Sequence, residues 1–196
     1  MSLQLIETRR VPAQAWRNGG GSTRELYTWP AGATADDWHM RVSLAEITRD
    51  GPFSVYDGVD RWFAVVDGAG VVLTLPDGRH MLDPHSAPVH FDGALAPHCS
   101  LNHRDTRDLN LMVRRDRGRG AMLRVKNDDE WLSSATLRAV YVAEPLTLQI
   151  DDADAAQLPA HTLAVSTYAR RQRWRVRGDS DTPAAWWIEF EARAGQ

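Results

Sequence analysis

The sequence of 196 residues contains a single cysteine, Cys99, so an internal disulfide is excluded. Because nothing indicates an oxidising compartment, we expect a cytoplasmic protein. Cys99 could be a small buried side chain or a nucleophile. We favour the buried side chain, because no helix start or base partner is apparent near it.

Long apolar runs and an excess of positive charge are also missing. The first ten residues contain no apolar run long enough for a secretion signal, and no stretch approaches the ~18 apolar residues of a membrane helix. The net charge is −3, whereas proteins that bind nucleic acid usually carry a basic excess. We therefore expect no membrane or nucleic-acid partner. As a separate expectation, the protein is a monomer or a weak homodimer.

Several signatures of catalytic and metal sites are absent. The seven histidines include no His-x-His pair, and His80, His85 and His90 are spaced by five, which does not place them on one strand face. No Gly-x-Ser-x-Gly, Cys-x-x-Cys or Gly-Lys-Ser/Thr sequence occurs. We expect no metal and no cofactor.

Period-two alternation is the pattern that is present, and it predicts strands. Between Trp38 and Leu44 every second residue is apolar, so this strand has one apolar and one more polar face. Asp67-Gly68 and Pro76-Asp77-Gly78 indicate turns of consecutive hairpins. Further strands are expected at Ser22–Trp29, Trp62–Val66, Val71–Leu75, Pro88–Phe91, Leu109–Val113, Ala121–Val125, Leu137–Val142, Leu146–Ile150, Leu163–Ser166, Trp174–Arg177 and Ala185–Glu191. Many short strands with frequent turns predict an all-β sandwich or barrel.

The charged stretch Arg114–Gly120 lies past the midpoint and is interpreted as an exposed connection, with an anion-binding patch as the alternative. It could join a larger first β unit, residues 1–116, to a smaller second unit, residues 117–196. The two halves share no obvious repeat, so a double barrel does not follow from repetition.

Three segments combine glycine with polar and aromatic residues. The first is Trp16–Glu25 (WRNGGGSTRE), where three glycines allow close backbone approach; it is a tight connection or a binding loop. The second is Gly51–Arg61 (GPFSVYDGVDR), which ends in an arginine that is either a surface cation or a carboxylate clamp.

The third segment is Asp108–Met112 (DLNLM). Alternation places Asp108, Asn110 and Met112 on one face, which is either a half-polar pocket wall or an exposed strand edge. If this face is enclosed, the acid needs a partner, because burying an unpaired charge is costly. Arg41 and Arg61 are the candidates.

These segments, with Met40–Leu44 (MRVSL), resemble the HutD/Ves family in order and spacing over the first 115 residues or so. The resemblance implies a cupin-type double-stranded β-helix. The chain would be a single bicupin unit of two fused barrels or sandwiches, whose termini may exchange strands. The resemblance also implies a link to histidine utilisation, where the protein would bind a small carboxylate such as N-formylglutamate in a metal-free pocket and moderate the pathway.

Carried over position by position, the resemblance implies a ligand-binding set of residues from all the segments. This set is Trp16, Asn18, Gly20, Thr23, Arg41, Ser43, Phe53, Ser54, Arg61, Asp108, Asn110 and Met112. The alternative function is a metal-independent isomerase or hydrolase acting on a histidine-degradation intermediate, with Asp108 as general acid or base. A protein-interaction module with an incidental cavity is a third hypothesis.

Overall fold

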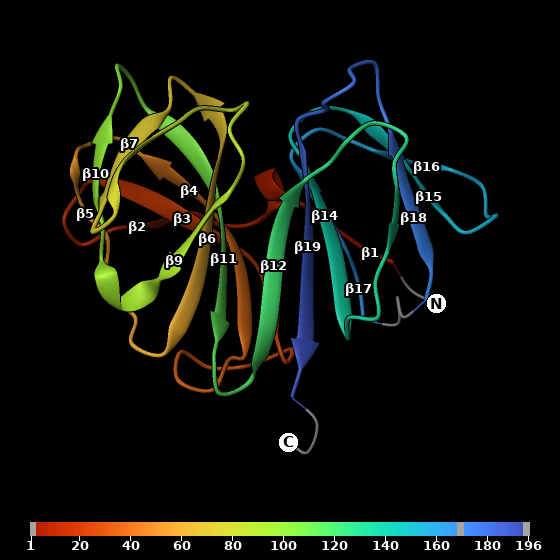
Figure 1. Ribbon diagram of the computed structural model, residues 1–196, viewed down its shortest axis with the longest axis horizontal. Helices are drawn as coiled ribbons and strands as arrows, with labels where there is room; N and C mark the ends of the chain where they lie inside the picture. The colour runs from red at the N-terminus through yellow and green to blue at the C-terminus, as the bar shows by residue number, and fades with distance from the viewer. Residues whose placement is uncertain (1–2, 168–170, 194–196) are drawn as a thin grey trace.

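The computed structural model describes residues 3–167 and 171–193, and antiparallel strands dominate it (Figure 1). The predicted all-β class is confirmed. Two 3₁₀ helices, η1 (Thr8–Arg10) and η2 (Gly93–Leu95), interrupt the strands. Within the described ranges, no helix is long and apolar enough to cross a membrane.

The strands form four sheets, which we group into two barrels. The first barrel contains a six-stranded sheet in the order β2 (Gln14–Ala15), β3 (Gly21–Trp29), β4 (Met40–Ile47), β11 (Thr106–Arg114), β6 (Val59–Gly68) and β9 (Val89–Asp92). It also contains a four-stranded sheet in the order β5 (Gly51–Pro52), β10 (His98–Leu101), β7 (Val71–Leu75) and β8 (Gly78–Leu82).

The second barrel has the same two-sheet plan. Its five-stranded sheet has the order β1 (Gln4–Glu7), β17 (Thr162–Ser166), β14 (Leu137–Val142), β19 (Ala185–Ala192) and β12 (Gly118–Arg124). Its four-stranded sheet has the order β13 (Glu130–Leu132), β18 (Arg173–Arg177), β15 (Leu146–Ile150) and β16 (Ala156–Leu158). The N-terminal strand β1 thus pairs with β17, far along the chain. The division near residue 116 stays a prediction.

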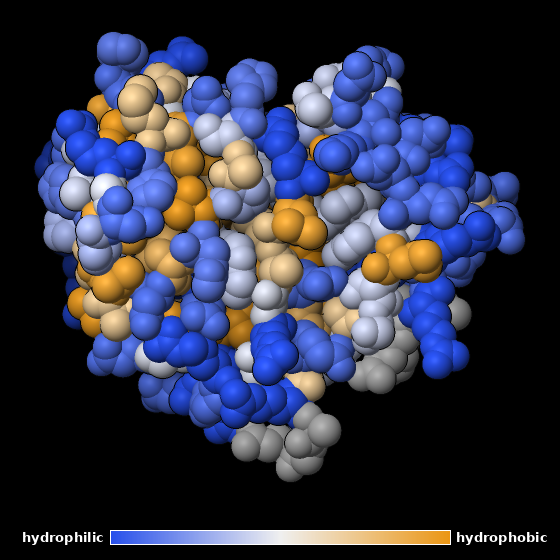
Figure 2. Space-filling model, viewed as in Figure 1, coloured by the Kyte–Doolittle hydropathy of each residue, from blue (hydrophilic) through white to orange (hydrophobic). Residues whose placement is uncertain are grey.

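The largest apolar core lies between the barrels rather than inside either of them. Strands β4, β11 and β6 turn one face toward this central core, to which β14 and β19 also contribute. Separate apolar clusters fill the second barrel and part of the first. Hydrophilic residues cover much of the face in Figure 2, and hydrophobic residues gather over the first barrel.

Alternation along β4 and β11 has the predicted effect. Val42, Leu111 and their apolar neighbours point into the central core, while Arg41 and Asn110 point into the first barrel. Trp186 and its neighbour Trp187 likewise lie in different clusters on opposite faces of β19. A strand between two layers separates its side chains in this way because its period is two.

Two local predictions are wrong. Asp67-Gly68 does not close a hairpin, because β6 pairs with β11 and β9 whereas β7 pairs with β8 and β10. The chain instead crosses between sheets here, and both Gly68 and Gly70 adopt positive φ. The expected connection Arg114–Gly120 is also shorter than predicted, because Gly118 already pairs with β19 as the first residue of β12. The second turn, Pro76-Asp77, does join a hairpin between β7 and β8.

Candidate ligand-binding site

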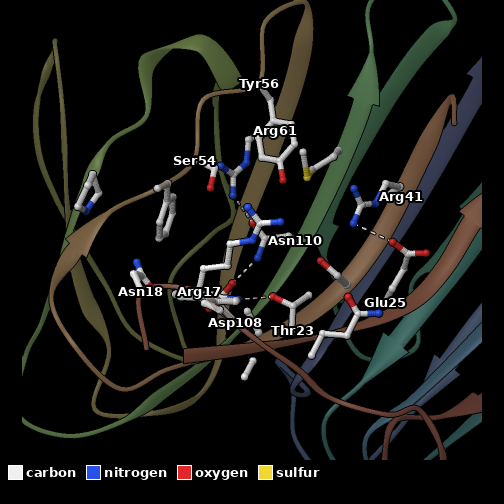
Figure 3. Close-up of a pocket in the computed structure, with 18 residues that line it drawn as sticks. Arg17, Asn18, Thr23, Glu25, Arg41, Ser54, Tyr56, Arg61, Asp108 and Asn110 are labelled. Atoms are coloured by element: carbon white, nitrogen blue, oxygen red, sulfur yellow. Dashed lines mark hydrogen bonds and ion pairs between the residues drawn. The ribbon is translucent and has the colours of Figure 1, made fainter. Parts of the chain in front are cut away.

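A cavity of about 530 Å³ opens into the first barrel (Figure 3). Its floor is the inner face of β3, β4, β11 and β6, and its rim includes the Trp16–Asn18 loop and residues after β5. Every residue of the predicted ligand-binding set except Gly20 lines it. Four separated segments therefore meet at one enclosed space.

Strand register orders the floor into rows. Met112 lies directly opposite Arg41 on one side and Arg61 on the other, so these three residues form one row across β4, β11 and β6. The next row inward pairs Asn110 with Ser43. The third row pairs Asp108 with Ala45. The two arginines are two strands apart, with an apolar thioether between them.

Arg61 is enclosed by aromatic rings at one end of the first row. Its side chain is buried, and its Cζ lies 5.0 Å from the ring centroid of Phe53, 5.7 Å from Tyr56 and 5.2 Å from Phe91. Burial lowers the pKa of this guanidinium from its usual value. Its Nη2 donates to Asn110 Oδ1 at 2.9 Å, while Nε and Nη1 have no hydrogen-bond partner.

Asn110 connects Arg61 to a buried acid. The Asn110 amide accepts from Arg61 and donates through Nδ2 to Asp108 Oδ2. Burial raises the pKa of Asp108 to about 8, although nearby Arg61 and the Asn110 hydrogen bond both lower it. Burial therefore favours the protonated form of Asp108 over the carboxylate. Asp108 Oδ2 accepts from Asn110, whereas its Oδ1 is buried and has no hydrogen-bond partner.

Arg41 does not pair with Asp108, contrary to one of the two pairings considered from sequence. Its Nη2 forms an ion pair of 2.7 Å with Glu25 Oε2, and its Cζ lies 5.4 Å from the Trp38 ring. Glu25 sits on the neighbouring strand β3, within reach of Arg41 across the sheet. The physical reason is proximity, because Asp108 is two rows deeper on β11.

The glycine-rich loop shapes the rim. Trp16 Nε1 donates to Thr23 Oγ1 at 2.8 Å, so the hydroxyl of Thr23 holds the indole against the cavity. A Cβ on Gly21 would lie 2.2 Å from the Glu46 carbonyl oxygen, so only glycine fits there. Gly20 accepts a hydrogen bond from Thr48 and borders a smaller neighbouring pocket rather than the main cavity. Gly20 therefore lies outside the lining of the main cavity, and its role in ligand binding stays a prediction.

The sequence reasoning missed several lining residues: Gln14, Ala15, Arg17, Glu25, Ala45, Pro52 and Tyr56. Glu25 and Tyr56 lay within segments that had been singled out, and alternation from Thr23 would have placed Glu25 on the cavity face. Arg17 also lines the cavity and gave no distinguishing signal in the sequence. The lining contains three arginines, Arg17, Arg41 and Arg61, against two acids, Glu25 and Asp108, so the cavity favours anions.

Cys99 and the histidines take no visible part in this chemistry. Cys99 is buried on β10, and burial with nearby carboxylates raises the pKa of its thiol to about 12, which makes it inert as a nucleophile. In the described residues no group of three or more His, Cys, Asp or Glu side chains is placed to hold a metal.

Comparison with known proteins agrees with the resemblance seen in the sequence. The Ves protein of Cronobacter sakazakii is 36% identical over 143 residues, covering 71% of this chain and 76% of that protein. The Ves protein of Citrobacter koseri is 35% identical over 59% of this chain, and the match spans only 60% of that relative's length. An uncharacterised 21.2 kDa protein from the hutC 3′ region of Pseudomonas putida is 33% identical, with 72% and 74% covered.

Solved structures support the fold. HutD from Pseudomonas fluorescens SBW25 superposes with a TM-score of 0.84 at 25% identity, covering 98% of this chain and all of that one. An oxalate decarboxylase from Lactobacillus farciminis has a TM-score of 0.61 at 9% identity, covering 97% and 86%, so the likeness is one of fold. The predicted cupin-type double barrel is confirmed. Because residues 8–184 match the HutD family, the chain belongs to that family.

Proposed function

We propose that the protein binds a small carboxylate, such as N-formylglutamate, in the cavity of the first barrel and thereby moderates histidine utilisation. The observation that carries the proposal is Arg61, a buried cation with two nitrogen atoms that lack hydrogen-bond partners. Buried polar groups are nearly always satisfied, so a carboxylate that accepts two N–H bonds suits this position. The name of the P. putida relative supports the link to the histidine pathway.

Other groups of the cavity would orient such a ligand. Ser43 offers a hydroxyl in the row next to that of Arg41, Met112 and Arg61. Trp16 and Phe53 bring apolar walls that exclude water and strengthen each polar contact. This combination of a few convergent polar groups with aromatic walls is typical of small-molecule sites.

Replacing Arg61 by methionine tests the proposal. Charge-assisted hydrogen bonds contribute about 1.5–3 kcal/mol each, so losing two should weaken N-formylglutamate binding about a hundredfold or more, as measured by calorimetry. Arg79→Met, at an exposed position on β8, is the matched control and should bind as the parent does. Circular dichroism would verify that both variants fold. Unchanged affinity in a folded Arg61→Met protein would contradict the assignment.

The raised pKa of Asp108 favours a second candidate, a metal-independent isomerase or hydrolase. A carboxyl group that titrates near neutral pH inside a cavity is suited to act as general acid or base. Incubation with urocanate, imidazolone propionate and N-formylglutamate, followed by product analysis, would separate the two functions. Turnover that Asp108→Asn abolishes would support the enzyme, and the lack of any product would support the binding protein.

The ligand itself can be sought without assumption. Mass spectrometry of the denatured protein would identify any small molecule retained through purification. A carboxylate from histidine breakdown would support the proposal, whereas a retained cation or apolar molecule would argue against it.

A further inference from the structure

One border of the first-barrel cavity is a single stretch of chain, the five consecutive residues Gln14–Asn18. This stretch contains β2, an edge strand that pairs with β3 through only two of its residues. All five residues are exposed except Trp16, which is partly buried. A segment with so few buried contacts belongs to the least stable part of a fold, because little free energy opposes its local opening.

The chain is anchored on both sides of this segment. Before it, the Val11 carbonyl accepts a hydrogen bond from the Arg24 side chain. After it, Gly21 packs so closely against the Glu46 carbonyl oxygen that a Cβ has no room. Just inside the second anchor, Gly19 adopts positive φ with nothing within 4 Å of its Cβ position. The backbone can therefore turn at Gly19 while the anchors stay in place.

A side-chain hydrogen bond latches the segment onto β3. Trp16 Nε1 donates to Thr23 Oγ1 at 2.8 Å, along the dashed line that reaches Thr23 in Figure 3. Trp16 and Asn18 line the cavity and also a smaller neighbouring pocket, so there is space on both sides of the segment. A segment with anchored ends and space on either side can move toward the cavity or away from it.

Arg17 is the charged residue of this segment. Of the three arginines that line the cavity, Arg61 donates to Asn110 and Arg41 pairs with Glu25. In the part of the chain that the structure describes, the Arg17 side chain has neither a hydrogen-bond partner nor an ion-pair partner. An anion in the cavity would therefore attract an unpaired cation on a movable segment.

We propose that Gln14–Asn18 is a lid that closes over a bound anion, and that Arg17 holds the lid closed by contacting the anion. Closure removes the guanidinium and the anion from water together, which strengthens their interaction. Arg61 then anchors the anion, while Arg17 sets how long it stays bound. This inference rests on the proposed anion-binding function, and it adds a moving part to a site whose anchor lies on β6.

Stopped-flow fluorescence with N-formyl-L-glutamate tests the lid, because Trp16 lines the cavity and can report binding. In Arg17→Gln we expect the dissociation rate constant to rise about tenfold, the effect of one charge-assisted hydrogen bond, and the association rate constant to change by less than about threefold. A fixed charge at the rim would instead alter mainly the association rate constant. Arg104→Gln is the matched control, since Arg104 is exposed outside the cavity, and both of its rate constants should equal those of the parent.

Hydrogen exchange of amides in the lid gives a second readout. The Trp16 amide donates to the Gly21 carbonyl at 2.9 Å, and the Gly19 amide donates to the Trp16 carbonyl at 3.0 Å, so both report whether the segment is in place. Saturating N-formyl-L-glutamate should slow the exchange of both amides about tenfold or more in the parent protein. The same acid should slow them much less in Arg17→Gln, because the contact that holds the lid closed is missing.

The outcomes separate the lid from the function on which it rests. If the parent binds the acid but Arg17→Gln keeps the parent's dissociation rate constant, the lid is overturned and the carboxylate site stands. Exchange of the Trp16 and Gly19 amides that does not slow on binding overturns the lid in the same way. If the parent does not bind the acid at all, the proposed function fails and the lid fails with it.

Discussion

Asp108 is an acidic side chain that is almost completely buried on β11. Burial raises its pKa to about 8 in the folded protein from an ordinary value of 3.8, so the folded state holds a proton that the unfolded state releases above about pH 4. The contribution of Asp108 to the free energy of unfolding is fully present below about pH 4 and is lost as the pH rises toward about 8. Over this window the free energy of unfolding should fall by up to about 1.4 kcal/mol per pH unit.

Asp108→Asn should remove that slope, because the amide mimics the protonated acid and does not titrate. Chemical denaturation between about pH 5 and about pH 8 measures it, with Asp105→Asn, an exposed position on the approach to β11, as the control. Identical slopes in the parent and in Asp108→Asn would show that the acid is ionised in the folded state throughout.

Alternation was sufficient to place Asp108, Asn110 and Met112 together on one face, because a strand has only two faces. It left open whether that face is exposed, and the structure shows that it lines the cavity. The partner of Arg41 did not follow from the sequence. Which carboxylate an arginine meets depends on the cross-strand register of β3 and β4, and a bulge between Glu25 and Tyr27 shifts that register.

At the scale of elements, the glycine-rich loop fixes how β3 meets its neighbours. Gly21→Ala would drive a methyl group against the Glu46 carbonyl oxygen at 2.2 Å and the Trp16 ring at 3.0 Å. We expect a loss of about 1–3 kcal/mol in the free energy of unfolding, the usual cost of overpacking, together with weaker ligand binding as the indole moves. Gly51→Ala is the matched control, because nothing lies within 4 Å of its Cβ position. Equal stability of the two variants would show that the loop adapts without strain.

Elements were predictable where the local pattern was strong. Val71–Leu75 and Leu137–Val142 have the predicted bounds, since both are apolar runs bounded by turn residues. Short edge strands such as β2 and β13 were missed, because two or three residues carry no periodicity. The predicted hairpin at Asp67-Gly68 is wrong because the local sequence does not say which strands pair. A turn that contains glycine can join two strands of one sheet or lead the chain from one sheet to another, as it does here.

The two barrels differ in what fills them. The interior of the second barrel holds Trp131, Trp174 and Trp187 in mutual ring contact, with the Arg138 guanidinium 4.2 Å from the first of these rings and 4.9 Å from the second. In the first barrel the aromatic rings instead surround Arg61 and leave the cavity beside it. The large number of tryptophans in the composition therefore reflects packing of one barrel as much as the site in the other.

The central core should make the barrels unfold together, because it draws side chains from both. Leu111 is fully buried there, on the middle of the first barrel's larger sheet, and Leu111→Ala should cost about 2–5 kcal/mol. Among the described residues, strand β15 of the second barrel contributes no side chain to this core. If the barrels unfold together, the slowest backbone amides of both β15 and β4 should exchange faster in Leu111→Ala than in the parent protein, by the same factor of roughly 30 or more. Leu123→Ala, at a half-exposed position on β12, should change neither strand. Faster exchange confined to β4 would mean that the first barrel opens alone and that the interface between the barrels transmits little stability.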